Sequence, residues 1–277
     1  MYIVGLAAKG AMWDPITLGP EKTVLDARNI LMKYNISRVV VAKNRKPLGI
    51  ITEKDIARFL YEEVPTKRLD EIRLDEVMSR NLVSVDEGTD LRICAKTMLD
   101  KHISSLLVVD SKKKLKGIFT KTDLATAYVE YFPMEHRVKE FMTQKVVTLA
   151  PDEPIHTVIM LMMGNKISRV VVAKNNRLIG IITGRDLLPL GAFFAGQNVK
   201  QRRKDQAFIP AGIKAAILAS DIMKPNPITI TAESDLADAA YIMLRNRISG
   251  LPVVDSNGIL TGIVTKTDAV RALATHA

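Results

Sequence analysis

The chain has 277 residues, 47% of them hydrophobic, which is enough to bury a substantial core and to form about two ordinary domains. Its 40 lysines and arginines outnumber 30 aspartates and glutamates, and the formal net charge of +10 favours anionic partners: nucleotides, nucleic acid or an acidic protein surface. The single cysteine, Cys94, excludes an internal disulfide. Because the N-terminal stretch does not resemble a signal peptide and the apolar runs are too short to span a bilayer, we expect a cytoplasmic protein with no membrane partner.

The first predicted elements follow one another within about 50 residues of the chain. A short extended stretch at Ile16-Thr17 precedes an amphipathic helix that begins at Val24, where apolar residues recur at i, i+3 and i+7. An apolar strand follows Ile36-Ser37, and a hairpin turn at Lys43–Lys46 leads into a second strand. That strand ends in Gly49–Asp55, which opens a second helix. The unit is therefore predicted to fold as strand, helix, strand, hairpin, strand, helix.

The same order recurs three more times along the chain. Each copy contains Gly, two apolar residues, Thr, two free positions and Asp, and the four motifs begin at Gly49, Gly117, Gly180 and Gly262. The helical stripes begin at Val24, Leu91, Ile155 and Leu236, and a methionine precedes each first strand, at Met12, Met78, Met142 and Met223. We expect an α/β (α+β) fold with repeats at residues 10–66, 72–131, 136–190 and 217–277, and an insertion at 191–216.

These features resemble the CBS-domain family, named after cystathionine β-synthase, over nearly the whole chain. In that family two repeats pair into a disc-like tandem called a Bateman module. The resemblance implies two pseudo-two-fold modules, repeat one with two and repeat three with four, joined near residues 132–137. It also implies a ligand-sensing regulatory protein that is not an enzyme, similar to nucleotide sensors such as the gamma subunit of AMP-activated protein kinase.

The Thr-x-x-Asp part of the motif has two interpretations. A Thr at a helix start with an acid three residues later is a variant of the capping box, which alone could explain the pair. The resemblance implies in addition that the Thr contacts a phosphate and the Asp accepts from ribose hydroxyls, and helix N-termini favour anions. A cap by itself requires neither the Gly nor Asp in preference to Glu. The pairs are Thr52 and Asp55, Thr120 and Asp123, Thr183 and Asp186, and Thr265 and Asp268.

The resemblance assigns further residues to the nucleotide site. Four first-strand residues would lie beside the base, unless they are only half-buried strand positions: Thr17, Ser84, Thr148 and Thr229. Arg38 and Arg169, which follow the Ile-Ser pair in repeats one and three, would reach phosphates because a guanidinium matches phosphate oxygens; the alternative is a surface arginine. Lys121 and Lys266 follow the motif Thr and could also reach phosphate, although a solvated surface lysine is the favoured interpretation. Glu53 at the same position would repel phosphate.

The predicted ligand is an adenine nucleotide, ATP, ADP or AMP, with or without Mg²⁺, and no redox cofactor, metal site or catalytic residue is expected. S-adenosylmethionine or a cyclic dinucleotide fits the sequence as well, and serines replace the histidines that the kinase gamma subunit often has after the isoleucine, which weakens any inference specific to AMP. We also expect a homodimer and a regulated partner protein. Nucleic-acid binding is an alternative through a basic cluster in the insertion, although a solvated loop is favoured there: Lys200, Arg202, Arg203 and Lys204.

Overall fold

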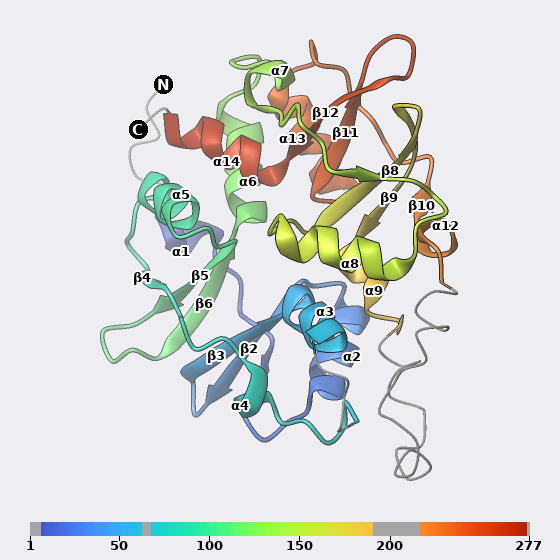
Figure 1. Ribbon diagram of the computed structural model, residues 1–277. Helices are drawn as coiled ribbons and strands as arrows, with labels where there is room; N and C mark the ends of the chain where they lie inside the picture. Colours follow the sequence, from blue (N-terminus) through green and yellow to red (C-terminus); the bar gives the residue numbers. More distant parts are fainter. Residues whose placement is uncertain (1–6, 63–67, 191–216, 276–277) are drawn as a thin grey trace, which may run out of the picture. The chain divides into compact units, whose positions relative to one another are not determined.

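The computed structural model describes residues 7–62, 68–190 and 217–275 (Figure 1). The chain divides into two compact units. Unit 1 combines Met1–Pro15, Leu82–Val146 and Pro227–Ala277, and therefore holds repeats two and four. Unit 2 combines Ile16–Asn81 and Val147–Asn226, and holds repeats one and three. The basic cluster of the insertion lies outside the described residues.

Each repeat is a small sheet with one helix before its antiparallel strand pair and another after it. Repeat one has β1 (Thr17–Leu18), α2 (Val24–Tyr34), β2 (Arg38–Lys43), β3 (Lys46–Thr52) and α3 (Glu53–Glu62). Repeat two has β4 (Ser84–Asp86), α5 (Leu91–Asp100), β5 (Ser105–Val109), β6 (Leu115–Thr120) and α6 (Lys121–Tyr131). Repeat three has β7 (Thr148–Leu149), α8 (Ile155–Gly164), β8 (Arg169–Lys174), β9 (Arg177–Thr183) and α9 (Gly184–Leu187). Repeat four has α13 (Leu236–Arg245), β11 (Gly250–Val254), β12 (Leu260–Thr265) and α14 (Lys266–Thr275).

The sheets of repeats one to three share the pairing of their first three strands, and β10 (Lys224–Pro225) adds a fourth strand antiparallel to β9 in repeat three. In each, the first strand pairs in parallel with the second, and the second pairs antiparallel with the third. Repeat four differs from the predicted pattern, because Ile230 makes only an isolated parallel bridge to Val253 where a first strand was expected. Thr229 therefore lies outside the strands.

Local sequence explains where these elements begin and end. The four first helices begin at the residues where the apolar stripes begin, as predicted. Thr23 caps α2 by accepting from the backbone N–H of Asp26 at 3.2 Å, and Asn35 ends the helix in the left-handed conformation. Asn44 and Arg45 both have positive φ angles, 52° and 60°, which is the geometry of a two-residue hairpin turn.

Four short segments, each ending in one of the recurring methionines, attach to a different repeat from the one that follows them in sequence. In unit 1, α1 (Ala8–Ala11) attaches to repeat two and α7 (Val138–Phe141) to repeat four; in unit 2, α4 (Leu74–Val77) attaches to repeat one and α12 (Ala219–Ile222) to repeat three. Each helix starts with a backbone hydrogen bond of 2.7–2.9 Å to the repeat that it covers. We call these the exchanged segments. In sequence, each exchanged segment directly precedes a repeat of the other unit.

The exchanged methionines explain the glycine that begins each motif. A Cβ on Gly117 would lie 2.6 Å from Met12 Sδ, and one on Gly262 would lie 2.8 Å from Met142 Sδ. The other two motif glycines face their methionines in the same way: Gly49 faces Met78, and Gly180 faces Met223. The glycine is therefore required by packing, whereas the capping interpretation had left it unexplained.

Helix packing joins the repeats in another combination. In unit 1, α6 of repeat two packs against α13 and α14 of repeat four, and α14 also packs against α5 (Figure 1). In unit 2, α3 of repeat one packs against α8 and α9 of repeat three. Fully buried side chains of both repeats, such as Tyr128 and Leu273, form one continuous apolar core in unit 1. Repeats two and four, and repeats one and three, therefore share their helical layers, a partnership that the sequence did not predict.

Candidate functional site

The Thr and Asp of the motif form a capping box in all four repeats. In each, the Thr backbone N–H and the Thr hydroxyl both donate to the same Asp oxygen, Oδ2, over 2.6–2.9 Å. The structural interpretation of the pair is thus confirmed. Because the cap occupies only Oδ2, the other carboxylate oxygen, Oδ1, remains an acceptor for a second group.

In repeats two, three and four, a side chain outside the capping pair lies within bonding distance of Oδ1. The Trp13 indole donates Nε1–H to Asp123 Oδ1 at 2.9 Å, and Lys224 Nζ lies 3.2 Å from Asp186 Oδ1. Arg271 pairs with Asp268 Oδ1 at 2.9 Å. Trp13 and Lys224 were not predicted, although both directly follow an exchanged methionine, and that shared position was the available signal. Burial raises the pKa of Asp123, against the lowering effect of its hydrogen bonds from Thr120 and Trp13.

Strand register brings the other predicted residues of a repeat to one face of its sheet. Arg38 pairs with Thr52 across β2 and β3, and Thr17 pairs with Val40, two residues along β2 from Arg38. Paired residues share a face, and alternate residues of a strand do too. Since Val39 packs into the core, Thr17, Arg38 and Thr52 lie together on the opposite face. Repeat three repeats this arrangement with Thr148, Arg169 and Thr183.

In unit 1 the two motif helices exchange lysines. Lys121 at the start of α6 donates to the Thr267 hydroxyl at 3.1 Å, and Lys266 at the start of α14 donates to the Thr122 hydroxyl at 3.1 Å. Lys266 is only 9% exposed and Lys121 is half-buried. The favoured prediction of solvated surface lysines is therefore wrong: the reciprocal helix packing draws both side chains into the contact between repeats two and four.

In unit 2 the equivalent place holds charges of both signs. Arg185 of repeat three donates to Glu53 of repeat one, with Nε 2.8 Å from Oε1. Lys54 donates to the Lys166 carbonyl at 3.2 Å, and its pKa is lowered by burial and by the neighbouring Arg169 guanidinium. Glu53, expected to repel phosphate, is thus already paired with Arg185, a cation that sequence reasoning missed.

Comparison with known proteins agrees with this repeated architecture. The model of the CBS domain matches four times, at residues 8–62, 74–130, 138–190 and 219–275. The chain belongs to the CBS-domain family. It is 28% identical over 273 residues to the uncharacterized protein MJ1225 of Methanocaldococcus jannaschii, covering 94% of this chain and 95% of that one.

Two further relatives show how far the similarity extends. Another protein of the same organism, MJ0188, is 30% identical over 139 residues, 50% of this chain and 44% of that one. Among solved structures, that of MJ1225 superposes with a TM-score of 0.84 at 24% identity, covering 97% of this chain and all of the other. A conserved protein of Pyrococcus horikoshii gives a TM-score of 0.64 at 21% identity with the same coverage.

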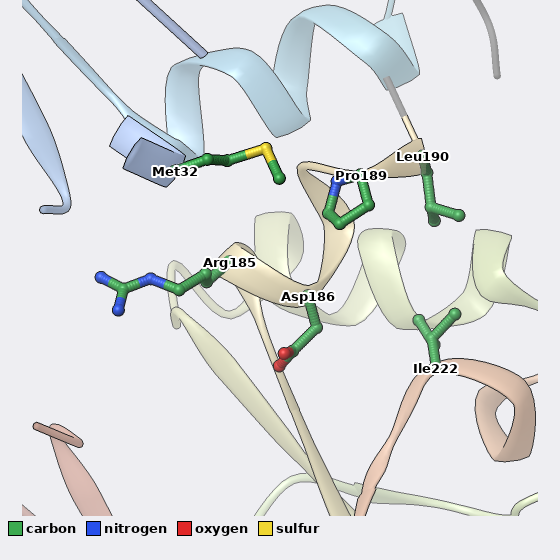
Figure 2. A pocket seen from close by; sticks show the side chains of 6 residues that line it. All are labelled: Met32, Arg185, Asp186, Pro189, Leu190 and Ile222. Atoms are coloured by element: carbon green, nitrogen blue, oxygen red, sulfur yellow. The ribbon is translucent and has the colours of Figure 1, made fainter. Parts of the chain in front are cut away.

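The third CBS repeat borders a pocket of about 430 Å³ within unit 2 (Figure 2). Of the predicted site residues only Asp186 lines it; the other lining residues are Met32, Arg185, Pro189, Leu190 and Ile222. Figure 2 shows the Arg185 and Asp186 side chains leaving α9 in different directions. Next in sequence to the lining residue Pro189, the carbonyl of Leu188 accepts from the buried Arg28 Nε–H at 2.7 Å. This pocket is mainly apolar and is formed by repeats one and three.

The first-strand residues of the CBS repeats are more open than expected. Thr17, Ser84 and Thr148 are exposed, and Thr229 is half-buried. Of the apolar residues that directly precede them, Ile228 is exposed while Ile16, Val83 and Val147 are half-buried. Among the residues that the structure describes, no cluster of acids, histidines or cysteines suits a metal ion, and no helix has the length and apolarity to cross a membrane.

Proposed function

We propose that this CBS-domain protein senses adenine nucleotides. In this proposal the first-strand residues lie beside the base, the motif Asp accepts a ribose hydroxyl on Oδ1, and the motif Thr and the nearby cations bind phosphate. The observation that carries the proposal is the common sheet face of Thr17, Arg38 and Thr52, at the end of the sheet where the motif helix begins. A helix N-terminus adds donors for an anion.

Cations from two repeats support the phosphate end of the proposal. Lys121 and Lys266 meet in unit 1, and Lys54 approaches Arg169 in unit 2. Positive side chains close together at the N-terminal ends of helices are unfavourable, because that end of the helix dipole is also positive. A bound phosphate would offset that cost in either unit. The solved relative MJ1225, described as a proposed archaeal homologue of the gamma subunit of AMP-activated protein kinase, is in keeping with this ligand class.

The proposed output is regulatory. Because each unit joins two repeats through their motif helices, a ligand that prefers one packing of these helices shifts the population of that packing, and a partner protein reads the change. We propose no catalytic step. A cytoplasmic location, homodimerisation and bound Mg²⁺ remain part of the proposal, as do the repeat boundaries at 10–66, 72–131, 136–190 and 217–277.

The test compares a nucleotide with its nucleoside. Removing Arg38 or Arg169 should weaken ATP binding by about 1.5–3 kcal/mol, the range for hydrogen bonds to charged groups, and leave adenosine nearly unchanged. Calorimetric titration of Arg38→Ala and Arg169→Ala measures both, and Arg177→Ala, at the exposed far end of the same hairpin as Arg169, is the matched control. Equal losses for ATP and adenosine would refute the phosphate role. Mass spectrometry of molecules released from purified protein tests the ligand class independently.

Nucleic-acid binding has no comparable support. It rests on the net charge and on the basic cluster at residues 200–204, which lies outside the described residues.

S-adenosylmethionine shares the adenosine part of the predicted ligand and would use the same aspartates. It lacks the phosphates, so the comparison of ATP with adenosine also separates these two ligand classes.

A further inference from the structure

Trp13 is bonded to the second CBS repeat although it precedes the first in sequence. Its backbone N–H donates to the Ile118 carbonyl at 3.0 Å, and the Ile118 N–H donates back to the Trp13 carbonyl at 2.9 Å. The neighbouring Met12 packs its thioether against the face of Gly117. The exchanged segment is thereby fixed to β6, close to the motif that ends in Asp123.

The indole is exposed and yet donates a hydrogen bond through its ring nitrogen. Trp13 is 71% exposed, yet its Nε1–H reaches Asp123 Oδ1 at 2.9 Å. That oxygen is the one that the capping box leaves to other donors, and Asp123 itself is half-buried. The ring therefore stands at the acceptor that a ribose hydroxyl would use, with its apolar faces uncovered.

This arrangement is peculiar to one repeat. The residues that follow the other exchanged methionines pair with the same strand position but carry no ring: Ser79, Thr143 and Lys224. Lys224 does approach the motif Asp of its own repeat, Asp186, which shows that this position reaches the carboxylate in more than one repeat. The residue after the methionine can thus give each site its own chemistry.

We propose that Trp13 is a specificity residue of the site in repeat two. Its indole N–H occupies Asp123 Oδ1 until a ribose hydroxyl replaces it, and the ring then stacks on the purine base. A ligand for this site must supply both a ribose diol and a flat base. This inference rests on the proposed function and adds the ligand features that one of the four sites selects. Stacking of a base on an aromatic side chain typically changes affinity by about tenfold or more.

Intrinsic fluorescence reports on this site alone, because Trp13 is the single tryptophan of the chain. Titration of the full-length protein with adenosine should change the Trp13 emission, whereas 2′,3′-dideoxyadenosine should need at least about tenfold higher concentration, since it lacks the hydroxyls that replace the indole on a charged acceptor. Asp123→Ala should abolish the difference between the two ligands. Lys116→Ala, exposed on the same strand β6, is the control and should retain it.

Calorimetry of two variants separates the donor from the ring. Trp13→Phe keeps a stacking surface and removes the competing N–H, so adenosine should bind at least as tightly as to the wild type. Trp13→Ala loses the ring and should bind about tenfold more weakly. Because the side chain is largely exposed, both variants should keep the wild-type melting temperature, which is checked in parallel.

The outcomes distinguish this inference from the function on which it rests. Equal responses to adenosine and dideoxyadenosine, or equal affinities of Trp13→Phe and Trp13→Ala, would overturn the role of Trp13 while binding heat still supports the proposed function. Heat of binding without any change in Trp13 emission would likewise overturn the role of Trp13 and still support the proposed function. Binding of ATP without binding of adenosine would overturn the role of Trp13 alone. If calorimetry detects binding of neither ATP nor adenosine to the wild type, the proposed function fails, and the role of Trp13 fails with it.

Discussion

The contact between a motif glycine and an exchanged methionine predicts a large effect from one methyl group. In Gly117→Ala the new Cβ would lie 2.6 Å from Met12 Sδ, 2.9 Å from its Cγ and 3.0 Å from its Cβ. Favourable contacts between such atoms lie near 3.5–4.0 Å. The thioether can move by rotation, but Met12 Cβ is fixed to a backbone segment that is itself bonded to β6. Overpacking of this kind costs about 1–3 kcal/mol, and we expect about 2 kcal/mol here.

Chemical denaturation of Gly117→Ala, with Gly164→Ala as the matched control, measures this loss. No atom lies within 4 Å of a Cβ added to Gly164 at the end of α8, so that change should be neutral or stabilise by up to about 1 kcal/mol, because alanine is the better helix former. The double-mutant cycle with Met12→Ala tests the mechanism: in that background Gly117→Ala should cost clearly less, because Sδ and Cγ are gone and only the 3.0 Å contact with the Cβ of residue 12 remains. The packing explanation would be refuted if Gly117→Ala lost as much stability in the Met12→Ala background as in the wild type. It would also be refuted if Gly117→Ala and Gly164→Ala had the same effect on stability.

Two further predictions concern buried polar groups. Burial raises the pKa of Asp123 in the folded state, so the native protein holds the carboxyl proton more tightly than the unfolded chain does. This contribution to the unfolding free energy is fully present below the ordinary carboxyl pKa, and it is lost as the pH rises through the raised pKa of the folded state. Asp123→Asn should remove that pH dependence of the unfolding free energy, and an unchanged profile would contradict the assignment. Arg28→Ala leaves the Leu188 carbonyl without its donor and should cost about 1–3 kcal/mol in chemical denaturation; a loss below a few tenths would show that water replaces the guanidinium.

Local patterns in the sequence were enough to predict the repeats. Helix starts such as Val24 and Leu91 follow from apolar spacing, and the hairpin at Lys43–Lys46 follows from its flanking strands, because both depend on residues close together in the chain. The capping role of the Thr-x-x-Asp pair was predicted for the same reason. The fourth repeat departs from the pattern, since Ile230 keeps a single bridge and no extended pairing.

The features that the sequence did not reveal all depend on segments distant in sequence. Lys266 resembles a surface lysine until α14 meets α6, and the burial of its side chain is a consequence of that packing. Trp13 has no visible relation to Asp123, 110 residues later, because the exchange of segments alone brings them together. The motif glycine is explained only by a methionine attached from another repeat.

The exchange of segments decides which pieces of this chain can stand alone. A polypeptide limited to one repeat would carry a short helix that belongs elsewhere and would miss the one that completes its own sheet. A fragment with repeats one and two retains both exchanged segments, as does a fragment with repeats three and four. Either half would nevertheless uncover the helical surface that the other half supplies, and apolar surface of that kind drives association with another molecule. A fragment with one pair of repeats is thus expected to bind a second chain, which would supply the helical surface that this protein encodes itself.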